Sequence, residues 1–457
     1  MIAQLVEKHF MMRHIGKLHD AIDQEIQLQQ KGDQAALDRA NKTGITIADL
    51  GNAKEHLAQT QANEPQQEDS ALCFIPQHAV TSVMQSVLQE HLTNHRSDLL
   101  SHTPTVANSQ VPFTATVLRS GGNEIVDLFS HFGPHDVGWT TCLVAQALRK
   151  LVGRHKFNTG PAPINPISNK ARIILLSDWG TGVPRAQDVG ASARRSLEEA
   201  ANQGRDVHVV HLGDVYYAGF KSEYDRQFLR YWPVHKDETN KFASYNLNGN
   251  HDMYSGGHDY FDYLLADQRF GRQQQCSFFG LENSYWQILA LDTAYEEGKL
   301  TEPQADWVAD KRNGSRHKAG ILLSHHQPFT AFEKAPAPEV LHALQPVIDQ
   351  NLILGWWWGH EHRCVLYAPQ TGIQYPRCIG YGGVPIIADK RPNPPGVNYQ
   401  YHDFVPGTDP AFARFGFVVM DFDNEKLHVQ YLGENGVPHY HEELTADATV
   451  SKPAGQV

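Results

Sequence analysis

Short apolar runs alternate with longer amphipathic stretches from about residue 170 onward. The runs are four to eight residues long and end in Gly, Asp, Asn or His, which is typical of β-strands. Strands are predicted at residues 172–177, 207–212, 242–247, 284–291, 321–324 and 352–358. The stretches between them predict helices at 184–202, at 222–232, after Thr301 with Pro303 in the first turn, and at 338–350. This alternation indicates an α/β domain.

The two ends of the chain have other patterns. Near the N-terminus, Ile15, Leu18, Ile22 and Ile26 form one apolar helical stripe. After a proline-containing connector at 160–169, the α/β pattern begins, and runs near the C-terminus predict a hairpin with Asn424 in its turn. We therefore expect a mainly helical accessory region at 1–165, an α/β domain at 170–440 and a polar tail at 441–457. The sequence does not identify a protein partner for the N-terminal region.

Composition excludes several classes of function. The chain has 457 residues and a formal net charge of −12, so no general attraction to nucleic acid or to an anionic membrane follows. Five scattered cysteines without a C-x-x-C pair argue against a disulfide framework and against a thiolate zinc site. No signal peptide and no apolar run long enough for a bilayer is evident, which predicts a cytoplasmic protein.

Chemically active side chains follow five of the predicted strands. They are Asp178-Trp179-Gly180, Gly213-Asp214 with Tyr217, Gly249-Asn250-His251-Asp252, His325-His326 and Gly359-His360-Glu361-His362. Carboxylate, amide, imidazole and phenol groups together form a ligand set for divalent or trivalent transition metals. The ligands are too many for one tetrahedral ion and suit two ions ~3.5–4 Å apart. His360 and His362 fit because positions i and i+2 of an extended chain face the same side.

This ordered series resembles the calcineurin-like metallophosphoesterase superfamily over roughly residues 170–435. The resemblance implies a four-layer α/β/β/α sandwich, here with a helical N-terminal extension. It also implies hydrolysis of a phosphoric ester by a dinuclear metal centre that provides hydroxide as the nucleophile. Gly180 stands where most members have histidine, and Tyr217 completes a Gly-Asp-x-x-Tyr motif. That exchange resembles the purple acid phosphatases, in which a tyrosinate binds ferric iron.

The resemblance also implies a role for each residue. Asp178, Tyr217 and His362 would hold the first metal, Asn250, His325 and His360 the second, and Asp214 would bridge them. His251 would contact the phosphoryl group and serve as a general acid. The expected metals are Fe(III) with Fe(II), Zn or Mn, and the expected substrate is a phosphorylated small molecule or another phosphoester.

Several alternatives remain open at this stage. Alignment of the strand favours His325 as the ligand, whereas counting back from Pro328 favours His326, which is otherwise expected to contact the substrate. His258 is either a substrate contact or a solvated loop histidine. Tyr217 taken alone would be a packing residue, since Tyr216 beside it is equally aromatic. The chain also lacks the signal and the N-terminal β-sandwich pattern of secreted purple acid phosphatases. A phosphodiesterase acting on cyclic nucleotides or other diesters, a non-catalytic partner-binding scaffold and a purely structural metal site are the rival functions.

Overall fold

The computed structural model describes residues 153–332, 339–386, 388, 391–405 and 411–446, together with residues 23, 26–34, 36, 37, 47, 51, 54 and 149. Most of the predicted helical region 1–165 therefore lies outside the described residues, although residues 26–30 are helical. Residues 447–457 of the predicted tail also lie outside them.

Two β-sheets form the centre of the described domain. The six-stranded sheet has the order β14-β13-β12-β2-β3-β4. Its strands are β2 (Ala171–Leu176), β3 (Asp206–His211), β4 (Phe242–Asn246), β12 (Gly416–Asp423), β13 (Lys426–Gly433) and β14 (Pro438–Thr445). The eight-stranded sheet has the order β1-β5-β6-β7-β8-β10-β9-β11. Its strands are β1 (Ile164–Pro166), β5 (Phe279–Glu282), β6 (Trp286–Leu291), β7 (Ala319–Ser324), β8 (Gly355–Trp358), β9 (Cys364–Tyr367), β10 (Tyr375–Ile379) and β11 (Val397–Gln400).

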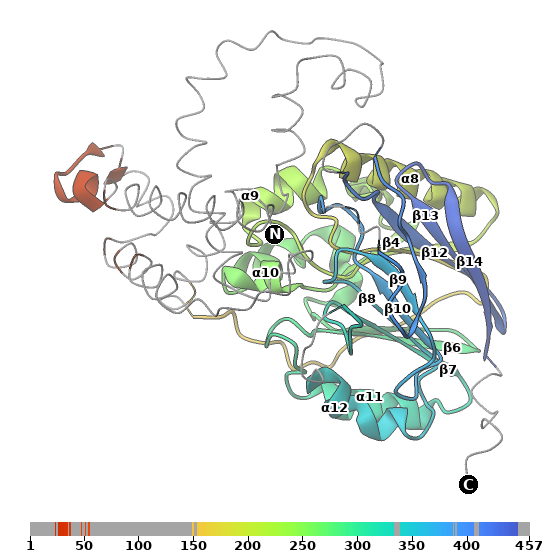
Figure 1. Ribbon diagram of the computed structural model, residues 1–457. Helices are drawn as coiled ribbons and strands as arrows, with labels where there is room; N and C mark the ends of the chain where they lie inside the picture. Colours follow the sequence, from red (N-terminus) through yellow and green to blue (C-terminus); the bar gives the residue numbers. More distant parts are fainter. Residues whose placement is uncertain are drawn as a thin grey trace.

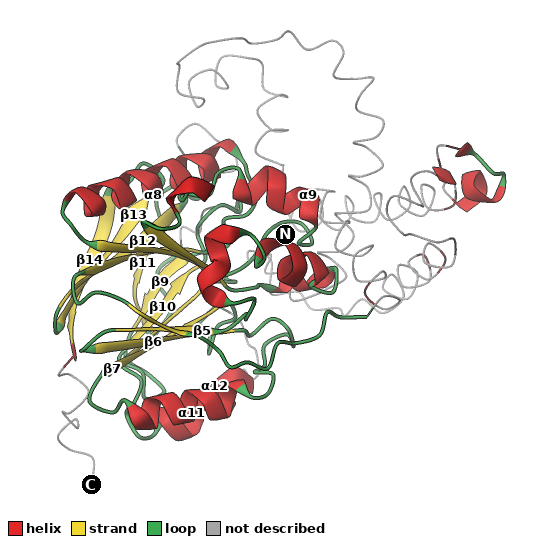
Figure 2. Ribbon diagram, turned by 180° about the vertical axis from the view of Figure 1, so that it is seen from behind, coloured by secondary structure: helices red, strands yellow, loops and turns green. Residues whose placement is uncertain are grey.

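Helices cover the outer face of each sheet (Figures 1 and 2). Helix α8 (Pro184–Asn202) lies on the six-stranded sheet, while α11 (Gln304–Gly314) and α12 (Glu339–Ile348) lie on the eight-stranded sheet. Shorter helical segments fill the connections: α9 (Lys221–Glu223), η3 (Tyr224–Leu229), η4 (Lys236–Glu238), α10 (Asn250–Tyr254), η5 (Tyr260–Leu264) and η6 (Gln268–Gln273). The predicted four-layer α/β/β/α arrangement is confirmed.

Three apolar clusters hold the layers together. One lies between the two sheets, and the other two lie between a sheet and its helices. Strand β8 shows how a strand serves two layers, because successive side chains point to opposite faces. Trp357 belongs to the cluster between the sheets and donates to the Tyr431 hydroxyl at 3.2 Å. Trp356 and Trp358 pack toward α12.

The structure differs from the predicted elements at a few points. The helix expected at 222–232 is divided into α9 and η3. Pro303, not Thr301, is the N-cap of α11. Strand β14 continues to Thr445, past the predicted domain end at 440, because it pairs with β13 along its length. Strand β1 also joins its sheet before residue 170, by pairing with β5.

The strand directions decide where the strand-end residues meet. Strands β2, β3 and β4 are mutually parallel, and so are β6, β7 and β8. The carboxyl ends of neighbouring parallel strands lie at one edge of a sheet, where α/β proteins commonly bind ligands.

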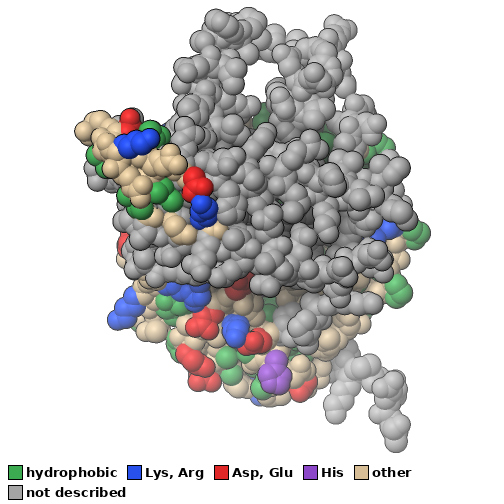
Figure 3. Space-filling model, turned by 60° about the vertical axis from the view of Figure 1, so that its left-hand side comes forward, with side chains coloured by type: hydrophobic (Ala, Val, Ile, Leu, Met, Phe, Trp, Pro, Cys, Tyr) green, Lys and Arg blue, Asp and Glu red, His purple; other side chains and the backbone are tan. Residues whose placement is uncertain are grey.

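The described surface has no single charge sign on the face shown in Figure 3. Acidic and basic side chains are interspersed there. Within the described residues, no helix has both the length and the apolar composition needed to cross a membrane.

Candidate metal centre

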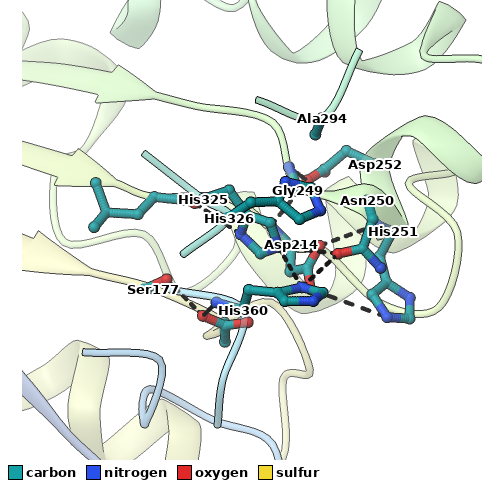
Figure 4. A network of polar contacts seen from close by, with 12 residues as sticks. Ser177, Asp214, Gly249, Asn250, His251, Asp252, Ala294, His325, His326 and His360 are labelled. Carbon is teal, nitrogen blue, oxygen red and sulfur yellow. Dashed lines mark hydrogen bonds and ion pairs between the residues drawn. The ribbon is translucent and has the colours of Figure 1, made fainter. Parts of the chain in front are cut away.

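All five strand ends singled out above lead to one buried cluster (Figure 4). Asp178 follows β2, Asp214 follows β3, and Asn250 opens α10 just after β4. From the other sheet, His325 follows β7 and His360 follows β8. Each of these side chains belongs to a residue that is no more than 4% exposed. Both sheets therefore deliver polar side chains to one place that is largely closed to water.

Glycines allow the close approach of these segments. A Cβ atom on Gly249 would lie 2.0 Å from Asp214 Oδ1, and one on Gly359 would lie 2.0 Å from Ser177 Oγ. Real Cβ contacts are never this short, so any side chain at either position would displace a carboxylate-bearing turn. This explains glycine in the Gly-Asn-His-Asp and Gly-His-x-His stretches without reference to backbone freedom.

One group of donors surrounds Asn250 Oδ1. The Asn250 amide nitrogen donates to the Tyr254 hydroxyl at 2.7 Å, which directs Oδ1 into the cluster. There Oδ1 lies 3.0 Å from His325 Nε2 and 3.0 Å from His360 Nδ1, and these two nitrogens are 3.3 Å apart.

The tautomer of His325 indicates a cation-binding site. Its Nδ1 lies 3.0 Å from the Leu212 carbonyl oxygen, which can only accept, so Nδ1 carries the hydrogen. In a neutral ring Nε2 then carries a lone pair, and it points at the Asn250 carbonyl oxygen. Converging lone pairs repel one another unless a cation lies among them. Nitrogen and oxygen donors in this arrangement fit a transition-metal ion.

A second group of donors lies beside the first. The Tyr216 hydroxyl is 3.0 Å from Asp214 Oδ2, 3.1 Å from His362 Nε2 and 3.3 Å from Asp178 Oδ1. His362 Nε2 is also 3.5 Å from Asp178 Oδ1. One hydroxyl hydrogen cannot satisfy two carboxylates and an imidazole, so this group too has more lone pairs than hydrogens.

Asp214 belongs to both groups. Its Oδ2 faces the Tyr216 hydroxyl, while its Oδ1 lies 3.5 Å from His325 Nε2. Donor atoms of Asp178, Asp214 and His362 lie within 4.8 Å of one another, and so do those of His325, His326 and His360. The two oxygens of one carboxylate therefore face two different groups of donors, an arrangement that would suit a ligand between two cations.

Burial gives the cluster its electrostatic character. It raises the pKa of Asp178 to about 7 and, together with the charges of Asp178 and Asp252, raises the pKa of Asp214 well above its usual value. Burial and neighbouring imidazoles lower the pKa values of His325 and His362 well below 6.5. Buried carboxylates beside neutral imidazoles are costly in isolation, and cations would compensate them.

The aromatic hydroxyl in the cluster belongs to Tyr216, whereas the motif spacing predicts Tyr217. Tyr217 participates through its backbone: its NH donates to Glu223 Oε1 at 2.5 Å, and its carbonyl accepts from His251 Nδ1 at 2.7 Å. Glu223 also accepts from the backbone NH groups of Ala218 and Phe220. The turn after Asp214 is thus held by a buried carboxylate, and this turn decides which of two adjacent tyrosines faces inward.

His251 lies against the bridging carboxylate. Its backbone NH donates to Asp214 Oδ1 at 3.0 Å, and its Nε2 is 3.9 Å from Asp214 Oδ2. Asp252 fixes the same turn, since its Oδ2 accepts from the NH groups of Gly249 and Asp214 at 2.7 and 2.9 Å. The sequence assigned no role to Asp252 or Glu223. A carboxylate three residues after a strand-end glycine would have been the only signal for Asp252.

The remaining candidates are placed differently. His326 lies in the cluster, with its ring centroid 4.6 Å from that of His360. His258 Nε2 lies 3.1 Å from the Gly153 carbonyl oxygen, in the segment that leads into the domain. Among the described residues, no hydrogen bond connects His258 to the cluster.

A small, partly open cavity adjoins the cluster at His362. Its lining is mainly polar and aromatic and includes Arg363, Tyr381, Gln400, Tyr401, His402 and Arg414.

Comparison with known proteins agrees with this geometry. Residues 171–364 match the family model described as calcineurin-like phosphoesterase. The matched residues run from β2 to the start of β9 and include every donor described above.

Solved structures with limited similarity are also found. They include GAP50, described as the anchor in the inner membrane complex of Plasmodium, with 10% identity and a TM-score of 0.45 over 62% of this chain and 95% of that chain. A dimetal phosphatase from Danio rerio has 13% identity and a TM-score of 0.41 over 60% and 99%. PhoD has 12% identity and a TM-score of 0.39 over 62% and 70%. No curated protein sequence matches the chain.

Proposed function

We propose that this protein hydrolyses phosphoric monoesters at a dinuclear metal centre. The observation that carries the proposal is the position of Asp214, whose two oxygens face two separate groups of buried donors. A structural metal site would need only one closed group of ligands. Two ions bound by these residues would supply Lewis acidity and an activated water for in-line displacement.

Residues of the chain perform the other tasks. Asp178 and His362 complete one cation site and Asn250, His325 and His360 the other. Ser177 donates to Asp178 Oδ2 at 2.6 Å and so directs Oδ1 toward the centre. His251, against the bridging carboxylate, is the proposed general acid for the departing alcohol.

The proposed metal pair is Fe(III) with Fe(II), Zn or Mn. A tyrosinate ligand is the reason for ferric iron, because a phenolate oxygen favours a trivalent ion. The position of the Tyr216 hydroxyl, within 3.3 Å of Asp178, Asp214 and His362, supports Tyr216 in this role. Tyr217, which the motif spacing favours, is the alternative.

Purified protein loaded with iron, zinc or manganese tests the proposal. We expect release of phosphate from an aryl monoester at a higher kcat/KM than from the matching aryl bis-ester. Asp214→Asn should abolish turnover, and Asp310→Asn on the exposed face of α11 is the matched control. A preference for the bis-ester would instead identify a phosphodiesterase. Absence of hydrolysis with all three metals would refute the proposal.

A further inference from the structure

A short segment before β1, residues 153–158, lies against the turn that follows α10 and is here called the strap. The His155 NH donates to the Gly256 carbonyl at 2.9 Å, and the Gly153 carbonyl oxygen lies 3.1 Å from His258 Nε2. A Cβ atom on Gly256 would lie 2.7 Å from the Gly153 carbonyl oxygen, so the two backbones touch. The strap therefore fits closely against the chain that leaves α10.

Side chains extend this contact. The His155 ring stacks on Phe261 of η5, with ring centroids 4.6 Å apart and ring planes inclined by 13°, and its Nε2 lies 3.2 Å from Asp262 Oδ1. Just before the strap, Arg149 donates to the Met253 carbonyl at 3.3 Å. The last carbonyls of a helix have no partner within that helix, and basic side chains can supply one. The C-terminal end of α10 is thus fixed by residues that precede the segment matched by the family model.

The strap is also bound to the loop that follows β6 in the eight-stranded sheet. Arg154 donates to the Tyr295 carbonyl at 2.9 Å, and the Tyr295 hydroxyl donates to the His155 carbonyl at 2.8 Å. The Phe157 ring packs on the rings of Phe278 and Tyr295, at centroid distances of 5.8 and 4.9 Å. One short segment therefore joins the turn after α10 to a loop of the other sheet.

The second cation site combines residues from the same two parts of the domain. Asn250 opens α10 after β4, whereas His325 and His360 follow β7 and β8. Helix α10 is only five residues long, so a shift of its C-terminal end would move Asn250 as well. Side chains that form a metal site must be held to within about 0.5 Å of their productive geometry. The donors of the first cation site lie outside α10.

We propose that the strap is a positioning element of the metal centre, which keeps Asn250 aligned with His325 and His360 for the second cation. Its main positioning residue is His155, because the backbone of His155 bonds to Gly256 on one side and to Tyr295 on the other. The inference rests on the proposed function and extends the functional unit to residues that the family model does not include. Loss of the strap contacts should weaken the second cation site and leave the first one near normal.

Two substitutions disturb the strap, and each has a matched control. Gly256→Ala inserts a methyl group against the Gly153 carbonyl. Gly204→Ala is its control, because both glycines have a positive φ, 94° and 70°, but a Cβ atom on Gly204 meets no described atom within 4 Å. His155→Ala removes the ring that stacks on Phe261. His155→Phe is the conservative variant, since it keeps an aromatic ring at this position.

Manganese titrated into the metal-free proteins gives two stepwise dissociation constants, and Asn250→Ala identifies the step that belongs to the second site. We expect Gly256→Ala and His155→Ala to raise that constant roughly 10- to 100-fold, the loss usual when a residue that supports a metal ligand is removed. The other constant should stay near the wild-type value. In the metal-free state, the amides of residues 250–257 should exchange hydrogen faster in these two variants. Gly204→Ala and His155→Phe should match the wild type in both measurements.

Three results would overturn the inference. Unchanged constants in Gly256→Ala and His155→Ala would remove the positioning role. Equal weakening of both steps would indicate general destabilisation, and equal effects of Gly204→Ala and Gly256→Ala would assign the loss to backbone conformation. A wild type that binds no metal overturns the proposed function and this inference together, whereas a wild type that binds two ions beside unchanged strap variants overturns only this inference.

Discussion

Replacement of Tyr216 by phenylalanine removes one oxygen atom from the centre of the proposed first metal site. That oxygen lies 3.0 Å from Asp214, 3.1 Å from His362 and 3.3 Å from Asp178. The aromatic ring itself is fully buried and would stay in place. The substitution therefore tests the hydroxyl alone.

The expected losses follow from these contacts. In the metal-free protein, the hydroxyl donates to a buried carboxylate, so its removal should lower the free energy of unfolding by about 1.5–3 kcal/mol. In the iron-loaded protein, loss of the hydroxyl should weaken metal binding by at least roughly 10- to 100-fold. Removal of a residue that only hydrogen-bonds to a metal ligand already causes a loss of this size. The visible charge-transfer band of a tyrosinate–iron(III) bond should disappear.

Tyr217→Phe is the matched control, because it removes the same atom from the adjacent residue. The absorption spectra and iron contents of the two variants show which tyrosine binds iron. If Tyr216→Phe bleaches the protein and Tyr217→Phe keeps its colour, the inward-facing tyrosine is the ligand. The opposite result would refute the reasoning from the turn geometry and favour the motif spacing. An active wild type that is colourless and free of iron would exclude a tyrosinate–iron site altogether.

Three further predictions concern the same centre. Removal of metal by a chelator should lower the melting temperature, since a ligand at 100 times its Kd stabilises the folded state by about 2.7 kcal/mol; re-addition should restore it, and an unchanged melting curve would argue against resident ions. In the metal-free protein, the pKa of Asp178 is raised to about 7 from about 3.9 in the unfolded chain, so the folded state retains a proton that the unfolded state releases. Stability should therefore fall as pH rises from about 4 to about 7, and denaturant titrations should show a flatter dependence for Asp178→Asn. Gly249→Ala places a Cβ atom against Asp214 Oδ1 and should reduce metal content and activity, whereas Gly271→Ala, where the Cβ atom meets nothing within 4 Å, should not; equal behaviour of both variants would contradict the packing argument.

Regular patterns explain why the main elements were predictable. Helix α8 begins and ends at the predicted residues, Pro184 and Asn202, because proline marks its first turn and a polar segment follows it. The hairpin of β12 and β13 with Asn424 in its turn is also confirmed, and Asn424 has the positive φ of 58° that asparagine tolerates. The short strands β5, β10 and β11 were missed, since four or five residues with little alternation give almost no periodic signal.

The candidate site, too, was predictable only in part. Residues at the ends of parallel strands were expected to meet, and the structure brings Asp178, Asp214, Asn250, His325 and His360 together. Which of two adjacent side chains faces inward could not be derived from the sequence. For Tyr216 it depends on a turn held by Glu223, and for His325 it depends on the Leu212 carbonyl, which lies far from it in sequence. Contacts of this kind exist only after the chain has folded.

Strand β2 lies between β3 and β12 in its sheet. The strand that leads to Asp178 therefore acquires its second flanking strand only from residues 416–423. During synthesis, β2, β3 and β4 emerge long before that partner, and β2 must remain an open edge for more than 200 residues. Exposed edges of this kind promote association with other chains. A protein truncated before β12 would therefore be expected to aggregate even though it retains every proposed metal ligand.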